Sequence, residues 1–68
     1  MSQEPVSLLS LPEVTRRTGC AKSFVYSEMR AGRFPRSTKI GAATRWSSAE
    51  ISAWIAARLA ERDGKVAA

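Results

Sequence analysis

Hydrophobic residues recur at helical spacing over the first half of the chain and again over its last third, and they alternate with polar residues in between. Ahead of the first helical segment, Ser10 and Glu13 have the spacing of a capping box, while Leu9 and Val14 occupy the positions of a hydrophobic staple. The pattern therefore predicts a first helix that begins after Ser10 and ends at Gly19.

The same start signal precedes the last helical segment. Ser47 and Glu50 form a second capping box, and Trp46 is placed to pack on Ile51 across it. The apolar stripe of this helix continues through three further residues: Trp54, Ile55 and Leu59. Asp63 and Gly64 are a stop signal, and residues 65–68 are expected to fray.

A middle helix is predicted between Gly19 and Gly32, with Val25 and Met29 on its buried side because they lie four residues apart. The opposite face carries small hydroxyl groups and a cation, flanked by two aromatic residues: Ser23, Ser27, Arg30, Phe24 and Tyr26. Such a face suits close approach to DNA base edges, since Ser and Arg both hydrogen-bond to them. Two short helices joined by about three residues are typical of a helix-turn-helix, in which Cys20 is expected to be buried.

Beyond the middle helix the period changes to that of strands. Residues 38–40 and 44–46 predict two short strands around a three-residue loop, 41–43. In this register Lys39 lies opposite Arg45, and the apolar residues of both strands point to the other face. Two opposed cations repel each other, so the pairing favours a polyanion lying against the hairpin. A solvated edge that resists aggregation is the alternative.

The predicted order of helix, helix, hairpin and helix is a mainly α fold with a small β-hairpin, the order of a winged helix-turn-helix. With 68 residues, the chain has room for one domain and one small core. We expect a flexible N-terminus over 1–7, the DNA-binding domain over 8–62 and a flexible tail over 63–68. The expected core residues are Val14, Val25, Met29, Trp46, Ile51, Trp54 and Ile55.

The chain carries 11 Lys and Arg against 6 Asp and Glu, a net charge of +5 at pH 7. The excess lies in the middle, where Glu28 is the single acid between Val14 and Trp46. The basic residues of this stretch are Arg16, Arg17, Lys22, Arg30, Arg33, Arg36, Lys39 and Arg45. A basic middle with slightly acidic flanks indicates a nucleic acid as partner.

The composition argues against catalysis. The chain has no His and a single Cys, Cys20, which excludes a Cys/His zinc site, an intramolecular disulfide and nucleophilic catalysis with a histidine base. The acids are scattered, and no pair is placed for acid–base chemistry. We expect neither enzymatic activity nor a cofactor. No apolar run suits a membrane span or a signal peptide, so the expected compartment is the cytoplasm, in association with the nucleoid.

Short motifs follow one another in a specific order over about residues 8–58. They are Leu8-Leu9-Ser10-Leu11-Pro12-Glu13-Val14, Thr18-Gly19, Lys22-Ser23, Val25-Tyr26, Gly32-Arg33-Phe34-Pro35, Lys39-Ile40-Gly41, Arg45-Trp46, Glu50-Ile51 and Ala53-Trp54-Ile55. In this order and spacing the chain resembles the AlpA family of small phage- and island-encoded regulators, which are similar to excisionases and to the DNA-binding domain of the MerR family.

The resemblance implies a small bacterial or prophage DNA-binding protein that regulates transcription. The matching recognition-helix positions are Lys22, Ser23, Phe24, Tyr26 and Ser27, and Arg30 follows on the same helix. Basic residues of the first helix and of the wing complete the predicted DNA-binding set: Arg16, Arg17, Arg36, Lys39 and Arg45. The chain departs from the family pattern at Ala21, where a hydroxyl cap is usual, at Phe24, where a small polar residue is usual, and at Ser27, where a basic residue is usual.

Three functions stay open on the sequence alone. A transcriptional regulator places the middle helix in the major groove of double-stranded DNA, whereas an excisionase bends an attachment site with several copies and recruits integrase. A protein-interaction or membrane-surface module built on the last helix is disfavoured, because the core needs the apolar stripe of that helix. Integrase and RNA polymerase are candidate protein partners. Several copies on DNA are expected, since one short module contacts few base pairs.

Overall fold

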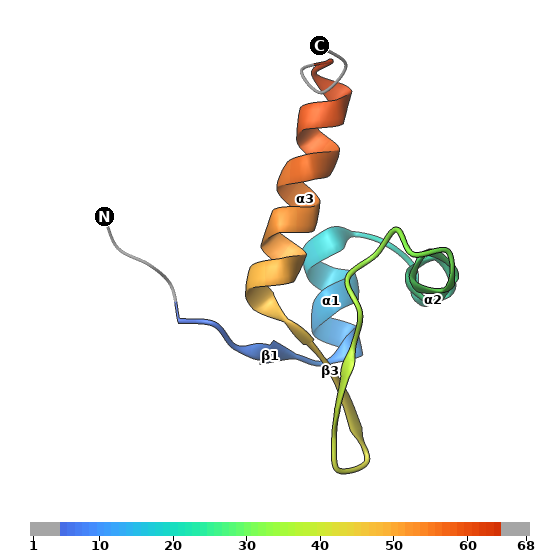
Figure 1. Ribbon diagram of the computed structural model, residues 1–68, viewed down its shortest axis with the longest axis vertical. Helices are drawn as coiled ribbons and strands as arrows, with labels where there is room; N and C mark the ends of the chain where they lie inside the picture. Colours follow the sequence, from blue (N-terminus) through green and yellow to red (C-terminus); the bar gives the residue numbers. More distant parts are fainter. Residues whose placement is uncertain (1–4, 65–68) are drawn as a thin grey trace.

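The computed structural model describes residues 5–64 and contains three helices and a three-stranded antiparallel sheet (Figure 1). The elements in chain order are β1 (Leu8–Leu9), α1 (Leu11–Thr18), α2 (Lys22–Arg30), β2 (Thr38–Ile40), β3 (Ala43–Ser47) and α3 (Ser48–Arg62). The predicted fold class, mainly helical with the order of a winged helix-turn-helix, is confirmed, with one additional strand ahead of α1. Residues 1–4 and 65–68, on which the expected loose ends largely fall, lie outside the described part, so the domain boundaries stay predictions.

The helix-turn-helix consists of α1, a short turn over 19–21, and α2. Gly19 ends α1 in the left-handed conformation, with φ 72°, and its N–H donates to the Thr15 carbonyl oxygen at 2.8 Å. Glycine is the favoured residue in this conformation because it has no Cβ. Ala21 is the N-cap residue of α2 and makes no side-chain cap bond. The two helices and the turn between them are therefore as predicted.

The capping box predicted at the start of α1 is wrong. Ser10 is the N-cap residue by its extended backbone, but its side chain accepts no hydrogen bond from the helix. The Glu13 carboxylate instead binds two cations of the next turn, Arg16 and Arg17. Hydrogen bonds between ionised groups are stronger than those to a neutral N–H, which explains why Glu13 does not turn back toward Ser10.

Strand β1 pairs with β3, the middle strand of the sheet, so that Leu8 lies opposite Ser47 and Leu9 opposite Trp46. Beside this pair, the Ser48 N–H donates to the Ser7 carbonyl and the Ser7 N–H donates to Ser48 Oγ, both at 2.8 Å. The sequence pattern predicts no strand here, because two residues are too few to show alternation. The pairing joins the start of the fold to the start of α3.

The hairpin of β2 and β3 has a two-residue loop, Gly41 and Ala42, where a three-residue loop is predicted. The register pairs Thr38 with Arg45, Lys39 with Thr44 and Ile40 with Ala43. Gly41 has φ 62° at the first loop position, where type II′ turns favour glycine. The predicted pairing of Lys39 with Arg45 is therefore wrong, and the two cations lie on opposite faces of the hairpin.

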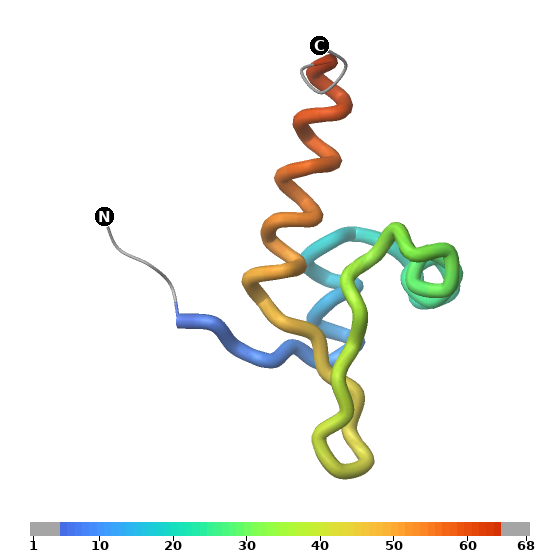
Figure 2. Tube along the Cα trace, in the orientation of Figure 1, coloured from blue at the N-terminus to red at the C-terminus, as the bar shows by residue number. Residues whose placement is uncertain are grey.

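The position of the hairpin explains this register. The hairpin projects from the body of the molecule (Figure 2), and all three residues of β2 are exposed. Alternation specifies a register only where one face of the strand is buried. Near the tip neither face of β2 is buried, so the turn sets the register, and Lys39 occupies the Trp46 side of the pleat while its side chain stays in solvent.

Helix α3 begins as predicted and extends beyond the body. Ser47 Oγ accepts a hydrogen bond from the Glu50 N–H at 3.3 Å, and the helix ends at Asp63, ahead of Gly64 with φ 76°. The first half of α3 lies on the sheet and on α1, whereas its second half stands clear of the other helices (Figure 1). Leu59, predicted on the buried stripe, is consequently 47% exposed.

The core lies where α1, α2, the sheet and the start of α3 meet. Its buried hydrophobic side chains are Leu9, Val14, Val25, Phe34, Trp46 and Ile51. Met29, Trp54 and Ile55, which were expected in this set, are partly buried and pack against it, as does Cys20. Phe34 is absent from the predicted core because its segment has neither helical nor strand periodicity, so burial there depends on tertiary packing alone.

The difference between the two halves of α3 gives a stability prediction. Ile51 is fully buried, so Ile51→Ala should lower the free energy of unfolding by about 2–5 kcal/mol, through lost burial and a residual cavity. Leu59→Ala, in the same helix, should change it by no more than about 0.5 kcal/mol. Urea unfolding followed by tryptophan fluorescence measures both variants. Equal destabilisation by the two substitutions would show that the far half of α3 is covered after all.

Candidate nucleic-acid interface

The outer face of α2 is a polar surface with one aromatic residue on it. Val25 is fully buried and Met29 is partly buried, which fixes the rotation of the helix. Lys22, Ser23, Phe24, Ser27 and Arg30 are all exposed, Phe24 by 44%. The structure thus brings together on one helix the side chains that were expected to read DNA.

Tyr26 belongs to the edge of the core as much as to this surface. Its ring packs edge-on against Trp46, with centroids 6.3 Å apart and planes inclined by 63°, and it is only partly exposed. Aromatic pairs favour such T-shaped contacts. Substituting Tyr26 would therefore change the packing of α2 on the sheet as well as any contact that its hydroxyl group makes.

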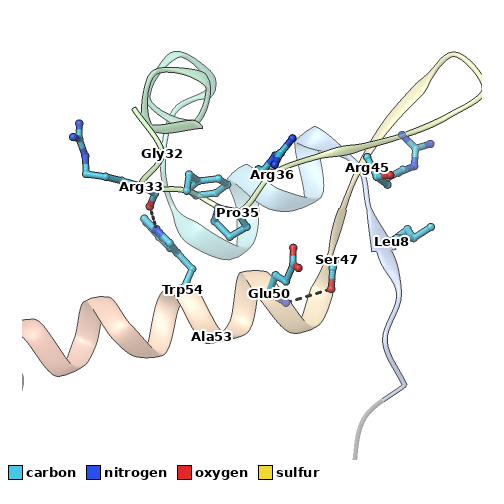
Figure 3. Close-up of a pocket in the computed structure, with 12 residues that line it drawn as sticks. Leu8, Gly32, Arg33, Pro35, Arg36, Arg45, Ser47, Glu50, Ala53 and Trp54 are labelled. Atoms are coloured by element: carbon cyan, nitrogen blue, oxygen red, sulfur yellow. Dashed lines mark hydrogen bonds between the residues drawn. The ribbon is translucent and has the colours of Figure 1, made fainter. Parts of the chain in front are cut away.

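A hollow of about 320 Å³ separates α2 from the base of the hairpin. It is lined by Tyr26, Met29, Arg30, Arg36 and Ser37. Arg30 comes from the last turn of α2 and Arg36 from the segment that leads into β2, so two guanidinium groups from different elements border the same space. The Arg36 side chain points away from α3 (Figure 3).

The cations of the hairpin lie on both of its faces. Lys39 pairs with Thr44 and is exposed, whereas Arg45 pairs with Thr38 and is half-buried. The Arg45 guanidinium also donates to the Thr44 carbonyl oxygen at 2.9 Å. A polyanion that follows the hairpin would therefore meet positive charge on either side of it.

The two cations predicted for α1 are placed differently. Arg16 and Arg17 both contact the Glu13 carboxylate, and the hydrogen bond from Arg16 is the main cause that holds the pKa of Glu13 below its ordinary value. Arg17 lines a separate hollow beside residues 5–7 and the first turn of α3. The structure does not bring Arg17 together with the cations of α2 and the hairpin.

A further arginine, Arg33, connects α2 to α3 and is absent from the predicted set. Its Nε and Nη2 atoms donate to the two carboxylate oxygens of Glu28 at 2.9 and 3.0 Å, and its N–H donates to the Glu28 carbonyl at 2.9 Å. The Trp54 indole N–H donates to the Arg33 carbonyl oxygen at 2.8 Å (Figure 3). We call these contacts the Arg33 clamp. Helical spacing alone could not reveal it, since α2 ends at Arg30 and Gly32, with φ 80°, lies between Glu28 and Arg33.

Aromatic contacts extend the clamp along α3. The Trp54 ring packs against Phe34, with centroids 4.8 Å apart, and the Arg58 guanidinium lies 5.0 Å from the centroid of Trp54. The same Trp54 borders an open groove of about 790 Å³ between α3 and the segment 32–36 (Figure 3). The surface that lines this groove is mostly apolar. Within residues 5–64, no group of His, Cys, Asp and Glu side chains is arranged to hold a metal ion.

Ion pairing divides the basic residues of the middle of the chain into two sets. Arg16 and Arg17 pair with Glu13, and Arg33 pairs with Glu28. Within the described part of the chain, no acidic side chain pairs with the others: Lys22, Arg30, Arg36, Lys39 and Arg45. The residues of this second set lie on α2, at the border of the hollow and on the hairpin. We call α2, the hollow and the hairpin together the cationic face. None of the helices in residues 5–64 is long and apolar enough to cross a membrane.

Comparison with known proteins shows that the chain is similar to phage proteins. The family model described as prophage CP4-57 regulatory protein (AlpA) matches residues 7–59. Among curated proteins, the chain is similar to an uncharacterized protein, ORF88, of Enterobacteria phage P4, with 36% identity over 55 residues. That alignment covers 79% of this chain and 62% of the relative, so the chain spans less than two thirds of the relative's length. No solved structure matches the chain.

The Arg33 clamp predicts a pH dependence of stability. Hydrogen bonds from Arg33 hold the pKa of Glu28 below its ordinary value of 4.5. A carboxylate with a lowered pKa in the folded state stabilises fully above its unfolded pKa, and this contribution disappears as the pH falls through the folded pKa. The difference in unfolding free energy between the parent chain and Glu28→Gln should thus be constant from pH 7 to 5 and shrink toward zero below about pH 4.

Urea unfolding at a series of pH values measures this difference. The control is Arg33→Gln, which removes the guanidinium and keeps the main-chain carbonyl that Trp54 binds. On that background the pH-dependent difference caused by Glu28→Gln should be much smaller, with only the charge of Arg58 left to lower the pKa of Glu28. A difference that persists unchanged without Arg33 would assign the pH dependence to another group.

Proposed function

The chain belongs to the AlpA family of prophage regulatory proteins, and on this premise we propose that it is a transcriptional regulator that binds double-stranded DNA in a sequence-specific manner. The observation that carries the proposal is the separation of charges described above. The basic residues without an acidic partner lie on α2, beside the hollow and on the hairpin. Cations without acidic partners that gather on neighbouring elements are the electrostatic footprint of a nucleic-acid partner.

Helix α2 is the element that we assign to the major groove. Ser23 and Ser27 have small side chains, which let the helix approach the bases closely. They lie one turn apart, so both can contact the same row of base edges. Phe24 offers only apolar contact, which suits a thymine methyl group. Lys22, in the first turn of the helix, is assigned to a phosphate or to a guanine at the edge of the site.

The remaining cations are assigned to the phosphate backbone. Arg30 and Arg36 border the hollow between α2 and the hairpin, where the ridge of phosphates between two grooves would lie. Lys39 and Arg45 approach phosphates from the two faces of the hairpin, and the Tyr26 hydroxyl lies at the rim. Such contacts set position and affinity without reading sequence. Arg16 and Arg17 are assigned weaker backbone contacts, because Glu13 already neutralises part of their charge.

The proposal includes the setting in which the protein works. We place it in the cytoplasm with the nucleoid, without catalytic activity, and in several copies on DNA, because one module of this size contacts few base pairs. Integrase or RNA polymerase is the proposed protein partner. A second candidate function is that of an excisionase, which bends attachment-site DNA. It is favoured by one observation, the hairpin that projects from the body with an exposed apolar residue near its tip (Figure 1).

The assignment of α2 is tested with a target duplex selected from a random library by the parent chain. Ser23→Ala and Phe24→Ala should each lower the preference for this target over a scrambled duplex by about 1–3 kcal/mol, because base contacts are lost. Arg30→Ala should weaken binding to both duplexes alike. Titrations of target and scrambled DNA at one fixed salt concentration give the ratio.

Melting temperatures confirm that the variants are folded. If folded Ser23→Ala and Phe24→Ala keep the full preference, α2 does not read the bases. If selection recovers no preferred duplex and the parent chain fails to bind DNA at low salt, the proposed function is wrong.

The hairpin assignment makes a separate prediction about salt. Lys39→Ala should weaken binding to every duplex to a similar extent and reduce the slope of log affinity against log salt by about one unit. Stability should not change, since Lys39 is exposed and lies opposite Thr44. The matched control is Arg62→Ala, which removes the same charge from the last turn of α3, away from the cationic face. If Lys39→Ala and Arg62→Ala reduce the slope of log affinity against log salt equally, the net charge of the protein, rather than the hairpin, sets the affinity.

A further inference from the structure

The tip of the hairpin has one large side chain. From Ile40 to Ala43 the residues are Ile, Gly, Ala and Ala, so every side chain after Ile40 is a methyl group or smaller. Ile40 is 53% exposed, although it is as hydrophobic as the fully buried Ile51. An isolated exposed apolar residue is ordinary on a protein surface. This one needs an explanation because it lies at the end of a projecting hairpin on the cationic face (Figure 2).

The backbone makes this tip narrow. The loop has two residues, and Gly41 takes the left-handed conformation that a tight turn requires. The loop therefore adds no side-chain bulk beyond a single methyl group. The minor groove of B-DNA is about 6 Å wide, too narrow for a helix, and a turn with so little side-chain bulk is the part of the hairpin that can reach into it.

Charge surrounds the apolar residue on both sides. Ile40 shares its face of the hairpin with Ala43 and Arg45, and Lys39 occupies the opposite face. The two phosphate strands that border a minor groove would therefore each meet a cation, Arg45 on the Ile40 side of the hairpin and Lys39 on the other side. A basic hairpin that only resists aggregation needs the cations, but it has no need of an isoleucine at the tip.

We propose that Ile40 is a wedge that enters the minor groove beside the α2 site and partly opens a base step, so that the domain bends its DNA. This inference rests on the proposed function, since it requires α2 to occupy the adjacent major groove. Apolar side chains inserted between base pairs kink the duplex toward the major groove, on the order of 20–90°. The steps that open most easily are TA and CA/TG, so the bend and the affinity depend on the step below the tip.

The test uses the selected duplex of about 30 base pairs, labelled with a fluorescence donor and acceptor at its two ends. The parent chain at saturation should shorten the distance between the ends. Ile40→Thr keeps a β-branched side chain of similar shape and hence the strand preference, but it puts a hydroxyl group in place of the apolar tip and should abolish the bend. Ile40→Leu keeps the apolar volume and should retain it.

Folding does not obscure the result, because Ile40 lies outside the core and the melting temperature of Ile40→Thr should equal that of the parent chain. A second readout is 2-aminopurine placed at each TA or CA step of the duplex. Its fluorescence should rise at one step with the parent chain and stay low with Ile40→Thr.

The remaining outcomes distinguish failure of the wedge from failure of the proposed function. If the parent chain binds without bending, or if Ile40→Thr at saturation bends the duplex as the parent chain does, the wedge is wrong and the proposed function stands. If the parent chain binds no duplex at all, the proposed function fails first. A bend that Ile40→Leu loses together with Ile40→Thr would also overturn the wedge, because apolar volume at this position is then not what produces the bend.

Discussion

The burial of Trp46 holds the parts of this small fold together. Its indole is fully buried on the middle strand, where Leu9 is its partner in β1 and the ring of Tyr26 packs against it from α2. Helix α3 begins two residues later, at Ser48. The indole N–H has no hydrogen-bond partner among the described residues. Burial of a side chain of this size stabilises by about 5 kcal/mol, which exceeds the cost of about 1–3 kcal/mol for the unmade bond.

The position of α2 relative to the hairpin depends on two connections at its opposite sides. Tyr26 joins the helix to Trp46 and the sheet, and Arg33 joins its end to α3 through Glu28 and Trp54. An arginine beside a helix that is proposed to contact DNA would ordinarily be counted as a DNA contact. Here the carboxylate of Glu28 occupies its guanidinium, so Arg33 determines geometry while its neighbours Arg30 and Arg36 keep their charge available.

Local signals in the sequence were sufficient for the helices and insufficient for the contacts between them. Gly19 and Ser47 mark helix ends by chemistry that acts over three or four residues, so those ends were predictable. The strand at Leu8 and Leu9 exists only because β3 lies beside it, and no local pattern encodes such a pairing. The prediction of the hairpin register assumed that one face of β2 is buried, but all three residues of β2 are exposed. For the site, the exposed side of α2 followed from Val25 and Met29, whereas the Arg33 clamp combines a contact beyond the end of α2 with a tertiary hydrogen bond from Trp54.

The hydrogen bonds between Ser7 and Ser48 join residues 41 positions apart, and this separation affects how the chain folds. The helix-turn-helix is complete in sequence long before the ribosome adds Trp46 and Ile51, which cover Val14 and Val25. Helices this short are marginal in isolation, so the nascent α1 and α2 cannot form a lasting structure by themselves. The core that packs α1 and α2 together therefore requires the start of the last helix. A chain that ends before Trp46 consequently lacks the residues that hold the helix-turn-helix together.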